Sequence, residues 1–243
     1  MSEYVGLNQA EEERAQKLHR ESIIIDGLCY MRPPTEKKYL HTLIEAGITA
    51  TNITVPEVNH NFGQTVRQIA DWYESVNRFG DLFMRIETVQ DIHRAKREGK
   101  TAIIMGFQDS MPLEMDLKLV DIFHALGVRI IQLTYQYRNF VGGGCGEEDP
   151  GLSCFGRDMV RKLNEAGILI DLSHCGPKTG MEAIELAAVP PAFTHAGLLT
   201  LCDHVRNKSD ELVQAIAEKG GLIGFPSYSQ FMDIRGTHRP TLV

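Results

Sequence analysis

The sequence predicts an α/β fold, a (β/α)8 TIM barrel of which seven of the eight β/α units are visible in the chain. Short apolar runs rich in β-branched residues alternate with longer amphipathic segments, which is typical of parallel strands joined by crossover helices. The strand runs are apolar on both faces, as strands buried beneath a layer of helices require.

The predicted strands and helices follow from this alternation. The strand runs are residues 22–28, 46–55, 101–107, 129–135, 168–174, 191–196 and 222–226. Helical patterns, with apolar residues recurring at three and four, lie at 65–79, 112–127, 153–167 and 209–221. Gly127, Gly167 and Gly220 mark expected helix ends, and Ser209 or Asp210 an expected helix start.

An open doubly wound sheet is the alternative fold. No G-x-G-x-x-G or P-loop pattern follows the first run, which removes the commonest reason to expect a nucleotide-binding version. After the last run, residues 227–243 are too few for another crossover helix and strand. We therefore expect residues 1–243 to form a single barrel domain that is truncated at the C-terminus, or whose gap a partner or a rearranged segment covers.

Composition excludes several classes of function. The net charge of −7 and the lack of a basic stripe argue against nucleic acid as a partner. No run resembles a secretory signal or approaches the length of a membrane span, so we expect a cytoplasmic protein that does not bind membranes. The five scattered cysteines lack a C-x-x-C pair and are expected to be free thiols.

Two histidines end neighbouring strand runs, His174 in ILIDLSH and His195 in PAFTHA. Active sites of barrels lie at the carboxyl ends of the strands, which are about 4.8 Å apart, so two inward imidazoles could share a metal ion at about 2.0 to 2.1 Å. A single histidine there is more often a hydrogen-bonded structural residue. Asp171 could orient an imidazole or bond only to backbone.

Other polar residues fall at the same rim. Arg206 could clamp a substrate carboxylate with its planar fork of donors, or could be an ordinary loop arginine paired with Asp203 or Asp210. The glycine-rich, acidic stretch 142–151 is expected to be a flexible rim or lid, because its acidic residues repel the phosphates that glycine loops can bind. The remaining rim residues are Asp26, Gln108, Tyr135 and Tyr228.

Several blocks of the chain resemble the renal, or membrane, dipeptidase family of zinc peptidases. They are GVRIIQLTY, GLSCFGRDMVRKLNEAGILIDLSH, PPAFTHA, RNKSDE and KGGLIG, in the family's order. The resemblance implies a (β/α)8 barrel of the metal-dependent hydrolase type with a binuclear zinc site, activity on dipeptides, and a homodimer. It matches His174 and His195 to the second zinc site, Arg206 to the arginine that holds the dipeptide carboxylate, and Tyr228 to a pocket tyrosine.

The chain departs from the family pattern at the first zinc site. The family motif Asp-Gly-His-x-Asp reads Asp26-Gly27-Leu28-Cys29-Tyr30 here, so both ligands are replaced. The bridging glutamate aligns with Gln108, a neutral and poor bridge between cations, and Asp109 could supply a carboxylate only if the strand has already ended. Tyr135 replaces the substrate-binding histidine, and the eighth strand with its aspartate ligand is absent.

The sequence therefore predicts a dipeptidase-like hydrolase that uses metal-activated water. Zinc is expected as one ion rather than two, or none, on His174 and His195, with Gln108 and Asp26 as catalytic partners. Arg206, Tyr228 and Tyr135 are expected to bind a dipeptide or another small carboxylated substrate. The alternatives are a non-catalytic relative that binds a small carboxylated ligand or a protein partner, and a fragment that folds poorly.

Overall fold

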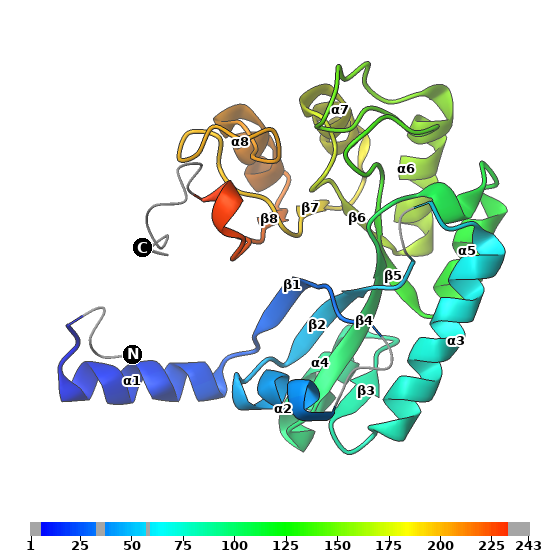
Figure 1. Cartoon of the computed structure of the whole chain (residues 1–243). Helices are drawn as coiled ribbons and strands as arrows, with labels where there is room; N and C mark the ends of the chain where they lie inside the picture. The colour runs from blue at the N-terminus through cyan, green and yellow to red at the C-terminus, as the bar shows by residue number, and fades with distance from the viewer. Residues whose placement is uncertain (1–5, 33–36, 57–58, 233–243) are drawn as a thin grey trace.

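One parallel sheet organises the molecule (Figure 1). The computed structural model describes residues 6–32, 37–56 and 59–232. Neighbouring strands follow the order β1-β2-β4-β5-β6-β7-β8, and β3 pairs with β4 alone. The strands are β1 (Ile25–Cys29), β2 (Ala50–Thr54), β3 (Phe83–Arg85), β4 (Thr101–Phe107), β5 (Val128–Gln132), β6 (Leu169–Asp171), β7 (Ala192–Phe193) and β8 (Leu222–Ile223). Each predicted run overlaps one strand of the main path.

Most of the helices lie around the outside of the curled sheet, whereas α1 extends away from it (Figure 1). The helices are α1 (Gln9–Glu21), α2 (Lys37–Glu45), α3 (Phe62–Arg78), α4 (Val89–Glu98), α5 (Lys118–Ala125), α6 (Cys154–Ala166), α7 (Pro177–Leu186) and α8 (Asp210–Glu218), with short 3-10 helices η1 (Met111–Leu113) and η2 (Ser229–Phe231). Gly127, Gly167 and Gly220 have positive φ, as expected at helix ends. Ser209 caps α8 by accepting from Leu212 N. No helix in the described ranges is long and apolar enough to span a membrane.

Strand β3 is missing from the sequence prediction. It has only three residues, too few for an alternating pattern, and it pairs with the first residues of β4, from Phe83↔Thr101 to Arg85↔Ile103. Strand β5 pairs with the last residues of β4 instead. Helices α1, α2, α4 and α7 were also not predicted; α1 has no buried residue and α4 buries only Ile92 and Ala95.

Side chains of β4 alternate between two apolar cores. Ile103, Met105 and Phe107 pack against the covering helices, and the Phe107 ring meets Phe123 of α5 edge-on at 4.8 Å between centroids. Ala102 and Ile104 belong to a second cluster on the opposite face. This period of two turns Gln108, the first residue beyond the strand, towards the inside of the curled sheet, where it lines the pocket.

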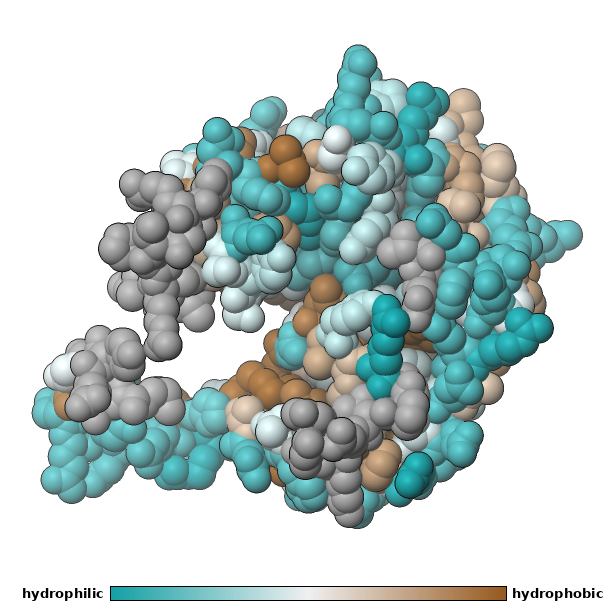
Figure 2. All heavy atoms as spheres, viewed as in Figure 1, coloured by the Kyte–Doolittle hydropathy of each residue, from teal (hydrophilic) through white to brown (hydrophobic). Residues whose placement is uncertain are grey.

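The sheet curls so that β1 and β8 face each other across an opening (Figure 1). These two strands do not pair with each other in the part of the chain that the structure describes. Ile25 and Leu222 are 53% and 60% exposed, and Figure 2 shows hydrophobic atoms beside the opening where β1 lies. In the described residues the fold is therefore an α/β sheet of the TIM-barrel type whose first and last strands do not meet. Residues 233–243, part of the segment predicted to be too short for another unit, lie outside the described residues.

Gly27 allows β1 to approach β7 closely. A Cβ at this position would lie 2.4 Å from the carbonyl oxygen of Thr194, which is main chain and has little freedom to retreat. We expect Gly27→Ala to lower the free energy of unfolding by roughly 1 to 3 kcal/mol, measured by urea denaturation. Gly63→Ala is the control, because its new methyl would meet nothing nearer than 3.7 Å and lies in helix α3. Equal stability of the two variants would contradict the close approach.

Candidate metal and substrate site

A pocket of about 870 Å³ opens at the carboxyl ends of the strands. All seven residues that the sequence singled out for chemistry line it, although they come from six separate parts of the chain. They are Asp26, Gln108, Tyr135, His174, His195, Arg206 and Tyr228. The chain thus brings these side chains together, and their individual roles stay predictions.

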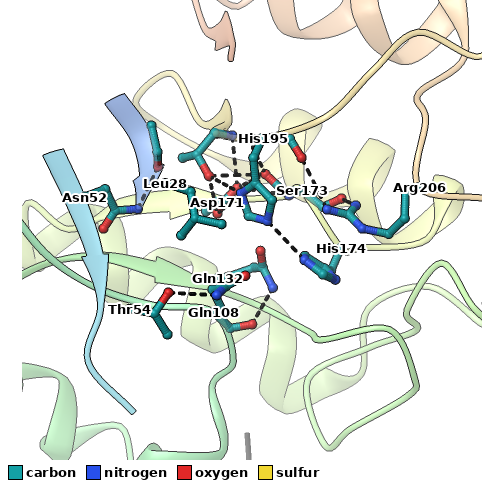
Figure 3. Close-up of polar contacts among 12 residues, drawn as sticks. Leu28, Asn52, Thr54, Gln108, Gln132, Asp171, Ser173, His174, His195 and Arg206 are labelled. Carbon is teal, nitrogen blue, oxygen red and sulfur yellow. Dashed lines mark hydrogen bonds and ion pairs between the residues drawn. The ribbon is translucent and has the colours of Figure 1, made fainter. Parts of the chain in front are cut away.

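The two strand-end histidines face each other within this pocket (Figure 3). His174 follows β6 and His195 follows β7, and their Nε2 atoms are 3.0 Å apart. Both are buried, with 6% and 9% of their surface exposed. Two imidazoles from neighbouring strands therefore present the same ring nitrogen to one point.

Asp171 orients His195 through a hydroxyl group. Thr194 Oγ1 donates to Asp171 Oδ2 at 2.7 Å and lies 2.7 Å from His195 Nδ1. Because its proton goes to the carboxylate, Thr194 Oγ1 accepts from the Nδ1–H of His195, which leaves the Nε2 of that ring with a free lone pair. The direct Nδ1 to Oδ2 distance is 3.8 Å, too long for a hydrogen bond. Asp171 also accepts from the backbone N–H of Ser173 and Thr194, so it bonds the backbone as well as the hydroxyl group next to His195.

His174 is held on two sides. Its Nδ1 lies 2.8 Å from Gln136 Oε1, and the Tyr135 ring stacks on its imidazole with centroids 4.2 Å apart. Tyr135 thus forms a wall of the pocket next to the proposed ligand. The ring of Tyr228, at the mouth of the pocket, is 54% exposed and contacts Phe231.

Arg206 is almost completely buried, with 2% of its surface exposed. Its terminal N–H groups donate to the main-chain oxygens of Ser173 and His195, so it ties together the ends of β6 and β7. Burial lowers the pKa of the guanidinium, and its Nε has no partner among the described residues. The alternative of a loop arginine paired with Asp203 or Asp210 is wrong, since the guanidinium bonds instead to the two histidine strands.

Strand β4 ends at Phe107, so Gln108 and Asp109 both reach the pocket. Gln108 Nε2 donates to Thr54 Oγ1 at 2.7 Å (Figure 3). Asp109 is buried and accepts from Asn139 Nδ2 at 2.9 Å, and burial raises the pKa of its carboxyl group. Asp26 accepts from Thr51 Oγ1 at 3.3 Å and from Leu28 N at 3.1 Å.

The glycine-rich stretch 142–151 was expected to be a flexible rim, and its first part instead packs into the structure, whereas residues 146–148 are exposed. Gly142, Gly143 and Gly144 are buried, and Gly143 N donates to Thr179 Oγ1 of α7. Asp149 accepts from the N–H of Thr179 at 2.8 Å. Asp149, one of the acidic residues that argued against phosphate binding, therefore bonds the start of α7.

Sequence reasoning missed the residues that hold the imidazoles. Gln136 and Thr194 each directly bond a histidine Nδ1, and Ser173 links Asp171 to the backbone N–H of His195. The only available signal was adjacency, since Thr194 precedes His195, Ser173 precedes His174, and Gln136 follows the rim residue Tyr135. Polar residues next to a candidate ligand are thus worth testing as its hydrogen-bond partners.

The nitrogen donors fit one metal ion. Two Nε2 lone pairs 3.0 Å apart can both reach an ion at the usual distance of about 2.0 to 2.1 Å. No group of three His, Cys, Asp or Glu side chains suited to a metal occurs among the described residues, so the pair supplies two ligands and leaves other positions to water or to amide oxygen. Gln132 pairs in register with Asp171 on the neighbouring strand. Its Oε1 atom is buried and has no hydrogen-bond partner in the described ranges.

Burial makes this pair resist protonation. Burial lowers the pKa of His195 from 6.5 to about 4, although the negative charge of Asp171 acts in the opposite direction. Burial and the positive charge of Arg206 together lower the pKa of His174 further. The unfolded chain takes up these protons near pH 6.5, before the folded chain does. Stability is therefore fully present above pH 6.5 and is lost as the pH falls towards 4.

We expect the metal-free protein to lose on the order of 3 kcal/mol of stability over this range. The measurement is urea unfolding between pH 8 and pH 4 in the presence of a chelator. In the double variant His174→Asn/His195→Asn the loss should be clearly smaller. An identical pH dependence in both proteins would show that the buried pair does not cause it.

Known proteins resemble this chain in sequence and in fold. The dipeptidase tcpJ of Claviceps purpurea (strain 20.1) is 32% identical over 162 residues, which cover 65% of this chain and 38% of that protein. The crystal structure of an amidohydrolase from Pseudomonas aeruginosa is 38% identical with a TM-score of 0.85, covering 89% of this chain and 66% of that one. A metallo peptidase from Rhodobacter sphaeroides, liganded with a phosphinate mimic of the dipeptide L-Ala-D-Ala, is 17% identical with a TM-score of 0.76, covering 90% of this chain and 77% of that one.

The chain spans well under half the length of the curated dipeptidase that it matches. The family model described as membrane dipeptidase, peptidase family M19, matches residues 12–242, which is nearly all of the sequence. The blocks that carried the resemblance lie within this range and include both histidines and Arg206. The chain belongs to the membrane dipeptidase family, peptidase family M19.

Proposed function

We propose that the chain is a dipeptidase-like, metal-dependent hydrolase that cleaves the peptide bond of dipeptides or similar small carboxylated amides. The observation that carries the proposal is the pair of buried imidazoles whose Nε2 atoms meet at 3.0 Å inside the pocket. Membership of a peptidase family supports the reaction class.

The metal would be one zinc ion, and His174 Nε2 and His195 Nε2 would hold it. A zinc ion in such a site lowers the pKa of a bound water and polarises a substrate carbonyl. One ion is favoured over two because Leu28 and Tyr30 stand where the resemblance places ligands of the first zinc, and neither side chain is a zinc ligand of the common kinds.

Arg206 anchors the substrate carboxylate in this proposal. Arg206 lines the pocket, and its Nε–H has no partner among the described residues, so this donor is available to a ligand. Tyr135 and Tyr228 shape the space between this anchor and the outside, one stacked on His174 and the other at the mouth. A small substrate with a free carboxylate suits a pocket of about 870 Å³.

Asp26 and Gln108 are the proposed catalytic partners. The bond from Gln108 Nε2 to Thr54 Oγ1 engages the amide nitrogen and leaves Oε1 as an acceptor for a water or an amide N–H. The Asp26 carboxylate lines the same pocket and can carry the proton that passes from water to the leaving amine.

A second candidate function is binding of a small carboxylated ligand or a protein partner without hydrolysis. Leu28 and Tyr30, together with the lack of any three-ligand cluster in the described ranges, favour it. It differs from the first proposal in one measurable respect, because a pure binder needs no metal.

The deciding experiment compares hydrolysis of L-Ala-D-Ala and other dipeptides by the whole chain after chelation and after zinc is restored. We expect turnover with zinc, loss of turnover in the double variant His174→Asn/His195→Asn, and weaker hydrolysis of dipeptides whose carboxylate is amidated. Binding of dipeptides without any turnover in zinc would overturn the hydrolase and favour the binder.

A homodimer is proposed from the family resemblance. The chain has a mass of 27.2 kDa, and sedimentation velocity of the purified protein should then give about twice this value. A single species with the mass of one chain would contradict the dimer.

A further inference from the structure

Gln136 bonds the nitrogen of His174 that points away from His195. Its Oε1 lies 2.8 Å from His174 Nδ1, and the Cys145 thiol donates to the same oxygen at 3.3 Å. An amide oxygen is only an acceptor, so His174 must carry its proton on Nδ1. Its Nε2 is then unprotonated and faces the equally unprotonated Nε2 of His195.

We propose that Gln136 is a positioning residue that fixes the tautomer of His174 and thereby keeps the pair open for a ligand. Two neutral imidazoles 3.0 Å apart would normally share a proton, one ring donating Nε2–H to the other. That bond would leave one Nε2 protonated and engage the lone pair of the other, so neither nitrogen would be free for a ligand. The acceptor of Gln136 prevents it by holding the proton on the far side of the His174 ring.

The backbone holds Gln136 in a conformation that is uncommon for a residue other than glycine. Its φ is 59°, in the left-handed region. Gly146 N donates to Gln136 O at 2.7 Å, and a Cβ at Gly144 would lie 2.3 Å from the same oxygen. The glycine-rich stretch 142–151, which has no part in the proposed reaction, thus packs around Gln136 and fixes its backbone.

The same loop bonds His174 directly. Cys145 N donates to His174 O at 2.9 Å, so the backbone of the proposed ligand and the side chain that sets its tautomer are secured by neighbouring residues. Tyr135, immediately before Gln136, stacks on the imidazole. Residues 135–136 and 144–146 together form a cradle for one face and one edge of the ring.

Two substitutions of Gln136 distinguish a role as hydrogen-bond acceptor from a role in packing alone. Gln136→Met keeps the length and flexibility of the side chain but removes its carbonyl oxygen. Gln136→Glu keeps the shape and offers only acceptors, so it should maintain the tautomer and act as the rescue. Cys145→Ala is the matched control, because it removes the other donor to the same oxygen without touching His174.

The first measurement uses metal-free protein with 15N-labelled histidine. Long-range 15N–1H spectra, assigned by the loss of signals in His174→Asn, report which ring nitrogen carries the proton. We expect Nδ1–H in the native chain, in Gln136→Glu and in Cys145→Ala, and a shift towards Nε2–H in Gln136→Met. A proton on Nε2 in the native chain, or an unchanged tautomer in Gln136→Met, would overturn the inference.

The second measurement is zinc affinity by competition with a coloured chelator. Gln136→Met should bind zinc roughly 10 to 100 times more weakly, as when the partner of a ligating histidine is lost, while Gln136→Glu stays close to the native value. The inference rests on the proposed function only for the identity of the ligand. If the native chain binds no zinc, the proposed function fails, and the tautomer measurement still decides the role of Gln136.

Discussion

Replacing Arg206 with methionine is expected to lower the free energy of unfolding by roughly 3 to 5 kcal/mol. The substitution keeps much of the apolar stem but leaves the carbonyl oxygens of Ser173 and His195 buried without their donors. Each lost bond from a charged donor costs about 1.5 to 3 kcal/mol. The measurement is urea unfolding at neutral pH, where the guanidinium is charged.

Two controls separate this brace from a general effect of removing a charge. Arg206→Lys keeps the charge but loses the planar group that bonds two carbonyl oxygens. Its free energy of unfolding should therefore lie between those of the native chain and Arg206→Met. Arg161→Met removes an exposed arginine whose ion pair with Asp158 lies on the surface, and it should change stability by less than about 0.5 kcal/mol. A similar loss from Arg206→Met and Arg161→Met would contradict the bracing role.

Alanine at either His174 or His195 is expected to weaken zinc binding at least about 100-fold. Loss of a residue that only orients a ligand weakens metal binding by up to roughly 100-fold, and loss of the ligand itself should cost at least as much. Because both Nε2 atoms point to one place, the double variant should bind no more weakly than either single one. Competition titration with a coloured chelator measures all three. Dipeptide hydrolysis should disappear in each of them to the same extent.

His93→Ala is the control for adventitious zinc on exposed imidazoles, since His93 lies on the surface of α4. It should leave the affinity unchanged. Effects of His174→Ala and His195→Ala that simply add in the double variant would mean two separate sites, and the shared ion would be wrong.

Long apolar runs were sufficient to predict the main path of the sheet. The seven runs each contain or overlap one of its strands. The central strands β2, β4 and β5 are buried on both faces, which leaves little choice of residue. Strand β3 could not be predicted, since Phe83–Arg85 has no pattern of its own and forms only because β4 offers it a free edge.

The composition of the pocket was predictable from one rule of parallel sheets. Side chains just beyond the strands converge, so Asp26 and Tyr228, 202 positions apart in the sequence, line the same pocket. The partners of the imidazoles were not predictable, because Gln136 reaches His174 only through a left-handed turn set by a glycine loop. Arg206 likewise resembles an exposed loop residue until the loop folds over the ends of β6 and β7.

The most direct test of the account is the position of zinc in crystals of the chain grown or soaked with the metal. Anomalous scattering at the zinc edge should reveal one ion about 2.0 to 2.1 Å from both His174 Nε2 and His195 Nε2. A map with no peak between these two atoms, in crystals where zinc is bound elsewhere on the chain, would contradict the shared site and the hydrolysis proposed from it.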